Sequence, residues 1–119
     1  MSVMAADPAT THDACIPASD LLARAFRFLG KRWNAVVLGH LSAGSAGFRE
    51  LSRAIDGISD SVLSARLADL AAGGLITRTV DAGPPVAVRY ELTDRGRALM
   101  PALEQIAFWA EENLPDDGA

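Results

Sequence analysis

The residues best suited to a chemical role lie in the segment GISDSVLSARLADLAAGGLITR, residues 57–78. Leucines at helical spacing mark one side of this segment as buried, and the opposite side then presents small side chains with few charges. Small side chains allow close approach to a base pair, hydroxyls can hydrogen-bond to its edge, and arginine can reach a guanine or a phosphate. The candidates for such contacts are Ser59, Ser61, Ser64 and Arg66.

Four more arginines flank these candidates and could bind the sugar-phosphate backbone of DNA. Arg49 and Arg53 lie one helical turn apart in the stretch before them, a spacing that suits phosphate contacts. Arg78 and Arg89 fall on two β-like stretches that follow. Taken singly, each arginine could equally be a solvated surface charge, whereas the group in this order favours a DNA-binding surface.

The charge of the chain is negative overall but unevenly distributed. The formal net charge is −4, yet all eleven basic residues lie between Arg24 and Arg97, where only seven acidic residues occur. The other eight acidic residues lie nearer the two ends. A basic middle with acidic ends is compatible with nucleic-acid binding.

Catalytic and metal chemistry have little support. The one cysteine, Cys15, cannot form a disulfide framework within the chain. His12 and His40 are too far apart in the sequence to predict a metal site with it. The sequence has no nucleophile elbow, phosphate-binding loop or HExxH zinc motif. We therefore predict no enzyme activity, no metal and no cofactor.

The size and composition favour one soluble domain. The chain has 119 residues, and no apolar run approaches the roughly 18 residues needed to span a bilayer. The first residues lack the basic start and apolar block of a secretory signal, so we expect a cytoplasmic protein without a membrane segment.

The elements that would position the candidate residues are mostly helical. Residues 1–16 are small and polar and predict a flexible arm, and residues 114–119 form an acidic tail. Between them we expect one domain, residues 17–113. Its first helix opens at Pro17 and carries an apolar stripe, and a second helix follows Lys31 and Arg32.

The third and fourth predicted helices form a helix-turn-helix. Apolar residues at helical spacing define the short third helix: Phe48, Leu51 and Ile55. Ser59 is a good N-cap for the fourth helix, which ends at Gly73 and Gly74. Two helices joined by a short turn containing glycine are typical of a DNA-binding helix-turn-helix.

A β-hairpin and a last helix complete the prediction. Residues 75–80 and 86–92 alternate between two faces on either side of a proline-bearing turn, which predicts a hairpin, the wing. Thr93 caps the last helix, whose inner side would carry Leu99, Leu103, Ile106 and either Ala107 or Ala110. The fold class is thus mainly α with a small β-hairpin: a winged helix-turn-helix flanked by N- and C-terminal helices.

Phe108 and Trp109 on the last helix exceed what one small core can cover. An apolar face left on a terminal helix is most readily buried against a second copy of the chain. We therefore expect the terminal helices to form a homodimer. A two-fold dimer would bind a pseudo-palindromic site whose half-sites lie about one helical turn of DNA apart.

From Cys15 to about Trp109 the sequence resembles the HxlR family of bacterial winged-helix regulators, relatives of the MarR type. The matching pieces, in order, are CIP at residues 15–17, GKRW at 30–33, FRELSRAIDGIS at 48–59, VLSARLADLAAGGLITR at 62–78, PPVAVRYELTDRG at 84–96, and the tryptophan near the end. The resemblance implies a transcriptional regulator that binds double-stranded operator DNA. This chain departs from the family pattern at two positions. It has Gly47 where the family usually has an arginine that contacts the DNA backbone, and Arg89 where the family usually has an acidic residue that forms a salt bridge in the wing.

The resemblance also gives Cys15 a role. Family members often use a cysteine at this position to sense oxidants or electrophiles, and a nearby helix start can make a thiolate more reactive. Any disulfide would have to join two chains or a small thiol, because the chain has no second cysteine. The alternative is a small buried side chain that packs the arm.

The interpretation that combines these observations is a homodimeric DNA-binding regulator, with repression as the expected sign, altered by oxidation or electrophile modification of Cys15. Two alternatives remain open. One is a winged-helix module that binds a protein partner. The other is a regulator that senses a small aromatic ligand at the dimer interface, with Trp33, Phe108 and Trp109 as the possible pocket, although aromatic residues at helical spacing are more often core.

Overall fold

The computed structural model describes the backbone of residues 15–115 and the side chains of residues 19–115. Most of the predicted arm and most of the predicted acidic tail lie outside the described residues. The chain divides into two compact units, residues 1–32 and 33–119, each described by itself. No helix of the described part is long and apolar enough to cross a membrane.

In the first unit the structure has helix α1, Cys15–Leu29. It begins two residues before the expected Pro17, which therefore lies in the first turn. Proline is tolerated there because the first backbone N–H groups of a helix have no partner within it. The helix ends at Leu29, and the N–H of the next residue, Gly30, donates to the Phe26 carbonyl at 2.8 Å.

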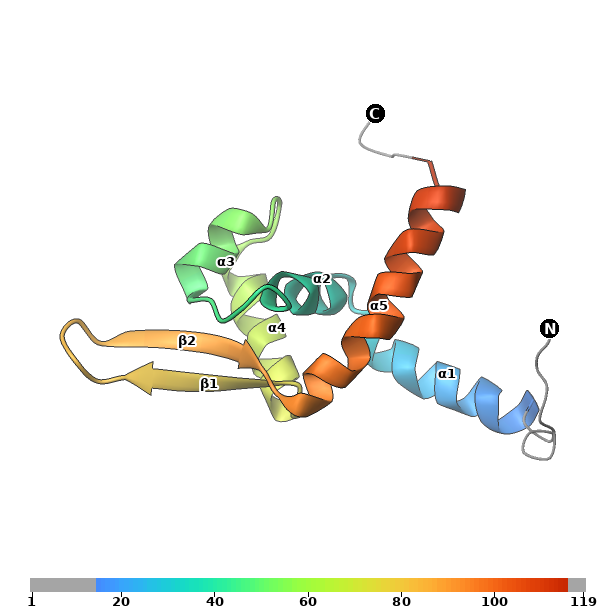
Figure 1. Cartoon of the computed structure of the whole chain (residues 1–119), viewed down its shortest axis with the longest axis horizontal. Coiled ribbons are helices and arrows are strands. Elements are labelled where there is room, and N and C mark those ends of the chain that lie inside the picture. The colour runs from blue at the N-terminus through green and yellow to red at the C-terminus, as the bar shows by residue number, and fades with distance from the viewer. Residues whose placement is uncertain (1–14, 116–119) are drawn as a thin grey trace. The chain divides into compact units, whose positions relative to one another are not determined.

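The second unit contains the predicted helix-turn-helix and hairpin (Figure 1). Its elements are α2 (Arg32–Leu41, beginning at the last residue of the first unit), α3 (Phe48–Ala54), α4 (Asp60–Ala72), β1 (Ile76–Asp81), β2 (Ala87–Leu92) and α5 (Asp94–Asn113). Within the described residues the chain is thus five helices with a two-stranded antiparallel hairpin, as the sequence predicts.

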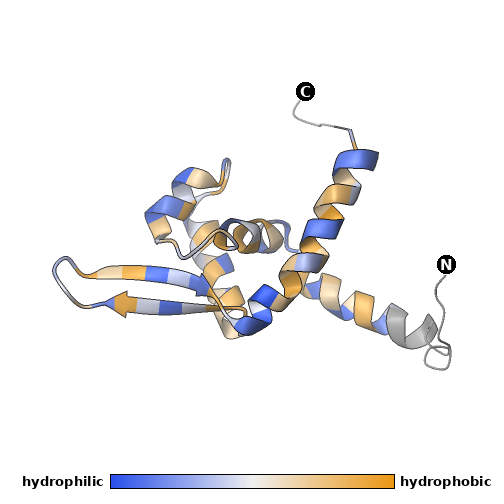
Figure 2. Ribbon diagram, viewed as in Figure 1, coloured by the Kyte–Doolittle hydropathy of each residue, from blue (hydrophilic) through white to orange (hydrophobic). Residues whose placement is uncertain are grey.

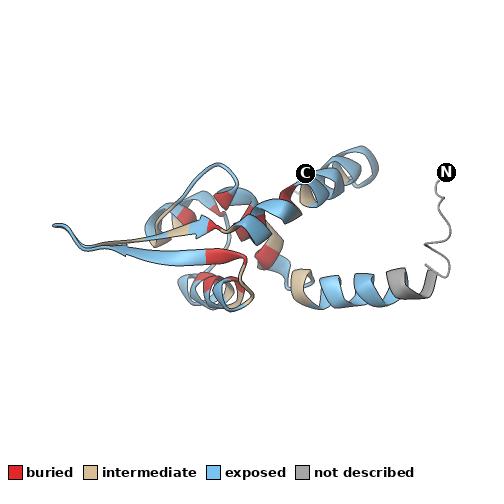
Figure 3. Cartoon of the chain, turned by 60° about the horizontal axis from the view of Figure 1, so that its bottom comes forward, coloured by how far each residue is buried: buried red, intermediate tan, exposed pale blue. Residues whose placement is uncertain are grey.

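The core of this unit lies where α2, α3, α4 and the base of the hairpin meet (Figure 3). Its fully buried side chains are mostly aliphatic: Val37, Leu38, Leu41, Leu51, Leu63, Leu70 and Ile76, with Asn34. The three leucines of α4 that mark its inner side are all buried, so the rotation of the helix matches the prediction. Its opposite side therefore points outward.

Both ends of α4 are set by the residues that the sequence indicates. The Ser59 hydroxyl accepts a hydrogen bond from the Val62 N–H at 3.1 Å, which caps the first turn. Gly74 follows the helix with a φ of +79°, a left-handed conformation that suits glycine and turns the chain into β1. Gly57, in the turn between α3 and α4, has a φ of +90°.

The hairpin has the expected faces and one extra partner. Ile76 pairs with Leu92, Arg78 with Tyr90 and Val80 with Val88. In addition, Ala46 forms an isolated antiparallel bridge to Tyr90, so the loop before α3 pairs with β2 at this one position. The sequence gives no β-like alternation around residue 46 that would have revealed this pairing.

Helix α5 is rotated relative to the prediction. Its buried residues are Gly96 and Met100, whereas Leu99 and Leu103 are only partly buried and Ile106 is 46% exposed. The helix starts against the core through Gly96, and this close approach fixes its rotation. Apolar and polar bands alternate along the whole helix (Figure 2), so periodicity alone could not select the buried stripe.

Candidate nucleic-acid interface

The outward side of α4 is a surface of small side chains. Ser61, Ser64, Ala65 and Ala68 are all exposed there. Ser59 is also exposed, but its hydroxyl oxygen caps the helix, and the same oxygen lies 3.3 Å from the Ser61 hydroxyl in a hydrogen bond that either residue can donate. The surface has the size and chemistry that a helix needs to enter the major groove of DNA.

The Arg66 side chain lies along the helix rather than outward. Its Nη2 is 3.1 Å from Oδ2 of Asp69, one turn further on, and only 17% of the side chain is exposed. To reach a base edge, the guanidinium would have to leave this carboxylate. A role for Arg66 in reading bases stays a prediction.

Helix α3 is tied to the first turn of α4 through Asp60. The Ser52 hydroxyl donates to Oδ1 of Asp60 at 3.0 Å, and Nη1 of Arg49 lies 3.6 Å from Oδ2. Arg53, one turn beyond Arg49, is exposed, and within the described residues its side chain has no hydrogen bond or ion pair. Arg49 therefore lies on the surface beside the start of α4, and Arg53 is exposed one turn further along α3; the sequence predicts phosphate contacts for both.

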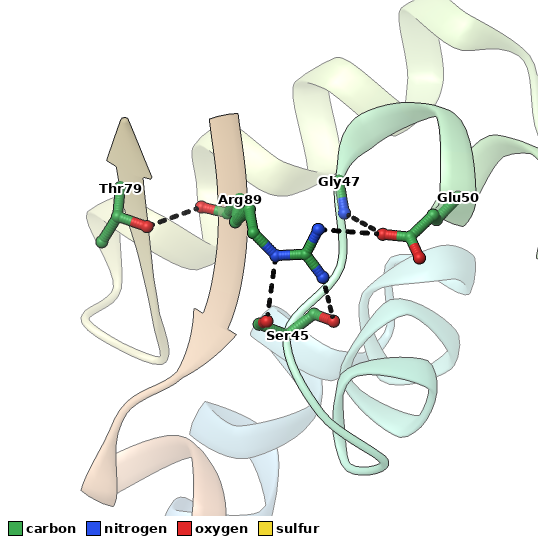
Figure 4. A network of polar contacts seen from close by, with 5 residues as sticks. All are labelled: Ser45, Gly47, Glu50, Thr79 and Arg89. Atoms are coloured by element: carbon green, nitrogen blue, oxygen red, sulfur yellow. Dashed lines mark hydrogen bonds and ion pairs between the residues drawn. The ribbon is translucent and has the colours of Figure 1, made fainter. Parts of the chain in front are cut away.

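The guanidinium of Arg89 has three interactions that anchor the wing (Figure 4). Its Nε donates to the Ser45 hydroxyl at 3.1 Å, its Nη2 donates to the Ser45 carbonyl at 2.8 Å, and its Nη1 lies 3.4 Å from Oε1 of Glu50. The same Glu50 oxygen accepts from the Gly47 N–H at 2.8 Å. The wing therefore does carry an ion pair at this position, to α3, despite the departures at residues 47 and 89.

Arg78, on the other strand, has a different environment. It lines a cleft of about 200 Å³ between α4 and the hairpin, together with Ser64, Leu67, Ala68, Ala71 and Tyr90. Arg78 is exposed and, among the described residues, has no hydrogen bond or ion pair. Two residues that the sequence assigns to the same wing surface are thus used differently.

The residues that position this surface were missed by reasoning from the sequence. Ser45 and Glu50 hold Arg89, and Asp60 links α3 to α4. Asp60 and Glu50 each occur in a first helical turn, which is a common place for acidic residues and gives no sign of these longer contacts.

The three aromatic residues proposed as a ligand pocket do not line the cavity between α2 and α5. A pocket of about 370 Å³ lies between α2 and α5, lined by Ala35, Val36, Gly39, Ser42, Met100, Leu103, Glu104, Ile106 and Ala107. Trp33 is partly buried, whereas Phe108 and Trp109 are 60% and 55% exposed. A ligand role for these three residues stays a prediction.

Cys15 is the first residue of α1, and its side chain lies outside the described residues. Among the side chains that are described, no group of three or more histidine, cysteine, aspartate or glutamate residues could hold a metal ion.

Comparison with known proteins supports a regulatory role for the chain. Residues 28–117 match the family described as HxlR-like helix-turn-helix. The chain is 42% identical over 89 residues to the uncharacterised HTH-type transcriptional regulator YvaP of Bacillus subtilis, covering 75% of this chain and 82% of YvaP. It is 36% identical over 88 residues to the transcriptional regulator YodB of the same species, covering 74% and 79%.

Solved structures agree with the fold. The reduced form of YodB from B. subtilis superposes with a TM-score of 0.71 at 35% identity, covering 77% of this chain and 90% of YodB. The oxidised form of the redox regulator HypR superposes with a TM-score of 0.74 at 29% identity, covering 80% and 98%. The predicted winged helix-turn-helix is therefore confirmed, and the relatives are transcriptional regulators rather than enzymes.

Proposed function

Because the chain belongs to the HxlR-like helix-turn-helix family of transcriptional regulators, we propose that it binds a pseudo-palindromic DNA operator as a homodimer and represses transcription from it. The observation that carries this proposal is the exposed, nearly uncharged side of α4 between the arginines of α3 and Arg78 of the wing. In this arrangement the arginines hold the backbone while the small side chains of α4 meet the base edges.

The exposed apolar side chains of α5 support the proposed homodimer. Ile106, Phe108 and Trp109 are each between 46% and 60% exposed on this helix, more apolar surface than a monomer usually leaves in water. Ile106 also lines the apolar pocket between α2 and α5, together with Val36 and Leu103. A two-fold dimer would place two α4 helices to read half-sites about 34–36 Å apart.

The Arg53→Ala variant tests DNA binding. We expect it to weaken binding to all duplexes by a similar factor. The negative slope of log affinity against log salt should become shallower by about one, because each phosphate contact releases about one counterion. Anisotropy titrations on a duplex that the wild-type protein selects from a random-sequence library, at about 50–200 mM salt, would measure the slope.

The matched control is Arg97→Ala, which removes the same charge from a guanidinium that already lies 3.4 Å from Asp94 and 3.6 Å from Glu91. Its slope should equal that of the wild type. Failure of the wild-type protein to select or retain any duplex, together with capture of a protein partner through α4, would instead support the protein-interaction module.

We further propose that modification of Cys15 releases the operator. Support comes from the relatives, since HypR is a redox regulator solved in reduced and oxidised forms and YodB has been solved after diamide treatment. With one cysteine per chain, the simplest oxidation joins two chains. Two thiols lose two protons and two electrons to diamide, which is reduced to the hydrazine, and an intermolecular S–S bond forms.

The Cys15→Ser variant tests this regulation. In the presence of diamide we expect the wild-type protein to lose DNA and to migrate on a non-reducing gel at twice its chain mass of 12.5 kDa, with dithiothreitol reversing both changes. The variant should bind DNA equally with and without diamide. A serine variant that still releases DNA in diamide would exclude Cys15 as the sensor.

A small-molecule inducer is the second candidate for regulation, and the pocket between α2 and α5 is the observation that favours it. A ligand there would contact both α2, which packs against α3 and α4 in the core, and the helix proposed to form the dimer. Release of DNA by an aromatic compound from the Cys15→Ser variant would identify this mode.

A further inference from the structure

We propose that one strand of the DNA lies in the cleft between α4 and the hairpin, and that the Arg78 side chain binds a phosphate of this strand. The proposal rests on the DNA binding proposed above and names the part of the wing that takes part in it. It assigns Arg89 to positioning the wing rather than to contact with DNA.

The pairing of the strands brings the cleft together. Ile76, Arg78 and Val80 share one face of the hairpin with their partners Leu92, Tyr90 and Val88. The Ile76–Leu92 pair is buried at the base, and Val80 is 54% exposed further out. The Arg78–Tyr90 pair lies between the two, at the edge of the core, where Ser64, Ala68 and Ala71 of α4 form the opposite wall.

Of the basic side chains of the hairpin, Arg78 is the one available to bind a phosphate. Residues 76–92 contain two basic side chains, Arg78 and Arg89. The Arg89 guanidinium is occupied by Ser45 and Glu50 (Figure 4), whereas Arg78 has no such partner among the described residues. A guanidinium complements a phosphodiester in charge and in hydrogen-bond geometry, and the small side chains on the α4 side of the cleft leave space for one.

The tip of the wing offers no competing cation. Residues 81–86 have the sequence DAGPPV, with one acidic residue and no basic one, and Val86 is 69% exposed. A wing that inserts a cation into the minor groove would need arginine or lysine at this tip. The positive charge of this wing lies instead at its base, next to α4.

The geometry of duplex DNA agrees with this placement. If α4 lies in the major groove and the hairpin extends toward the neighbouring minor groove, the strand that separates the two grooves passes between them. The cleft at Arg78 is the space between these two elements. Ser64 and the alanines leave room there for the deoxyribose next to the phosphate.

The test compares three single substitutions on the duplex selected by the wild-type protein, titrated at about 50–200 mM salt. We expect Arg78→Gln to weaken binding about tenfold and to lower the salt slope by about one, because it removes one charge-assisted phosphate contact. Arg78→Lys should keep the slope. Arg89→Gln should weaken binding without changing the salt slope, because it loosens the wing but does not change the number of phosphate contacts.

Ethylation interference locates the contact. In the wild-type complex, an ethyl group on the phosphate between the α4 major groove and the adjacent minor groove should block binding, and the Arg78→Gln variant should have lost that sensitivity. Thermal melting of each free variant checks that it is folded. A wild-type slope for Arg78→Gln, or a slope lost only in Arg89→Gln, would overturn the proposal even if Arg53→Ala confirms DNA binding.

Discussion

Replacing Gly96 with alanine is expected to lower the free energy of unfolding by about 3 kcal/mol, against the gain of about 1 kcal/mol that alanine normally brings to a helix. A Cβ at this position would overlap the Leu75 carbonyl oxygen and lie 3.1 Å from Cδ2 of Leu92. The Leu75 carbonyl also accepts the Thr93 N–H at 3.0 Å, so it cannot move without breaking the entry into α5.

Thermal unfolding followed by circular dichroism measures this effect. For a domain of this size, about 3 kcal/mol corresponds to a fall in melting temperature of roughly 10–15 °C. Gly39→Ala is the matched control, because Gly39 is exposed within α2 and a Cβ there would meet no atom within 4 Å. It should raise the stability by about 0.5–1 kcal/mol. Equal melting temperatures for the two variants would contradict the close approach at Gly96.

The Ser61→Glu variant is expected to bind its selected DNA more than about 100-fold less tightly while folding at least as well as the wild type. Ser61 is exposed in the first turn of α4, where a carboxylate stabilises the helix through its dipole. The same carboxylate would face the negative potential of the DNA groove. Stability and binding should therefore change in opposite directions, which separates a surface effect from misfolding.

Ser61→Gln is the control for side-chain size, because glutamine has nearly the shape of glutamate without its charge. Its loss of affinity should be about tenfold or less, comparable to the loss of one hydrogen-bonded contact. Anisotropy titrations of both variants and chemical denaturation of both proteins give the two quantities. If the two variants bind DNA equally well, the outward side of α4 does not approach DNA.

The sequence was sufficient where one face of an element is buried. The spacing of Leu63, Leu67 and Leu70 predicted which side of α4 points outward, and alternation around Arg78 and Tyr90 predicted the faces of the hairpin. Both patterns arise from local burial, which repeats along the chain at the period of the helix or strand.

Contacts between distant residues have no such period and could not be predicted. Arg89 and Ser45 are 44 residues apart, and the bridge between Ala46 and Tyr90 brings them together. In the same way, Gly96 decides the rotation of α5 through a contact with Leu75, which the long apolar stripe of that helix did not reveal. The candidate arginines could therefore be named from the sequence, but not their separate roles.

The carboxylates beside these arginines give the protein its own internal counterions. Asp60, Asp69 and Glu50 lie 3.1–3.6 Å from Arg49, Arg66 and Arg89, so each of these cations already faces an anion before DNA arrives. A phosphate that displaces one of them exchanges one anion for another and gains little free energy. Of the arginines proposed to contact DNA, only Arg53 and Arg78 have no ion pair within the described residues, so in the proposed binding mode these two would hold DNA that lacks the operator sequence, and would hold it weakly.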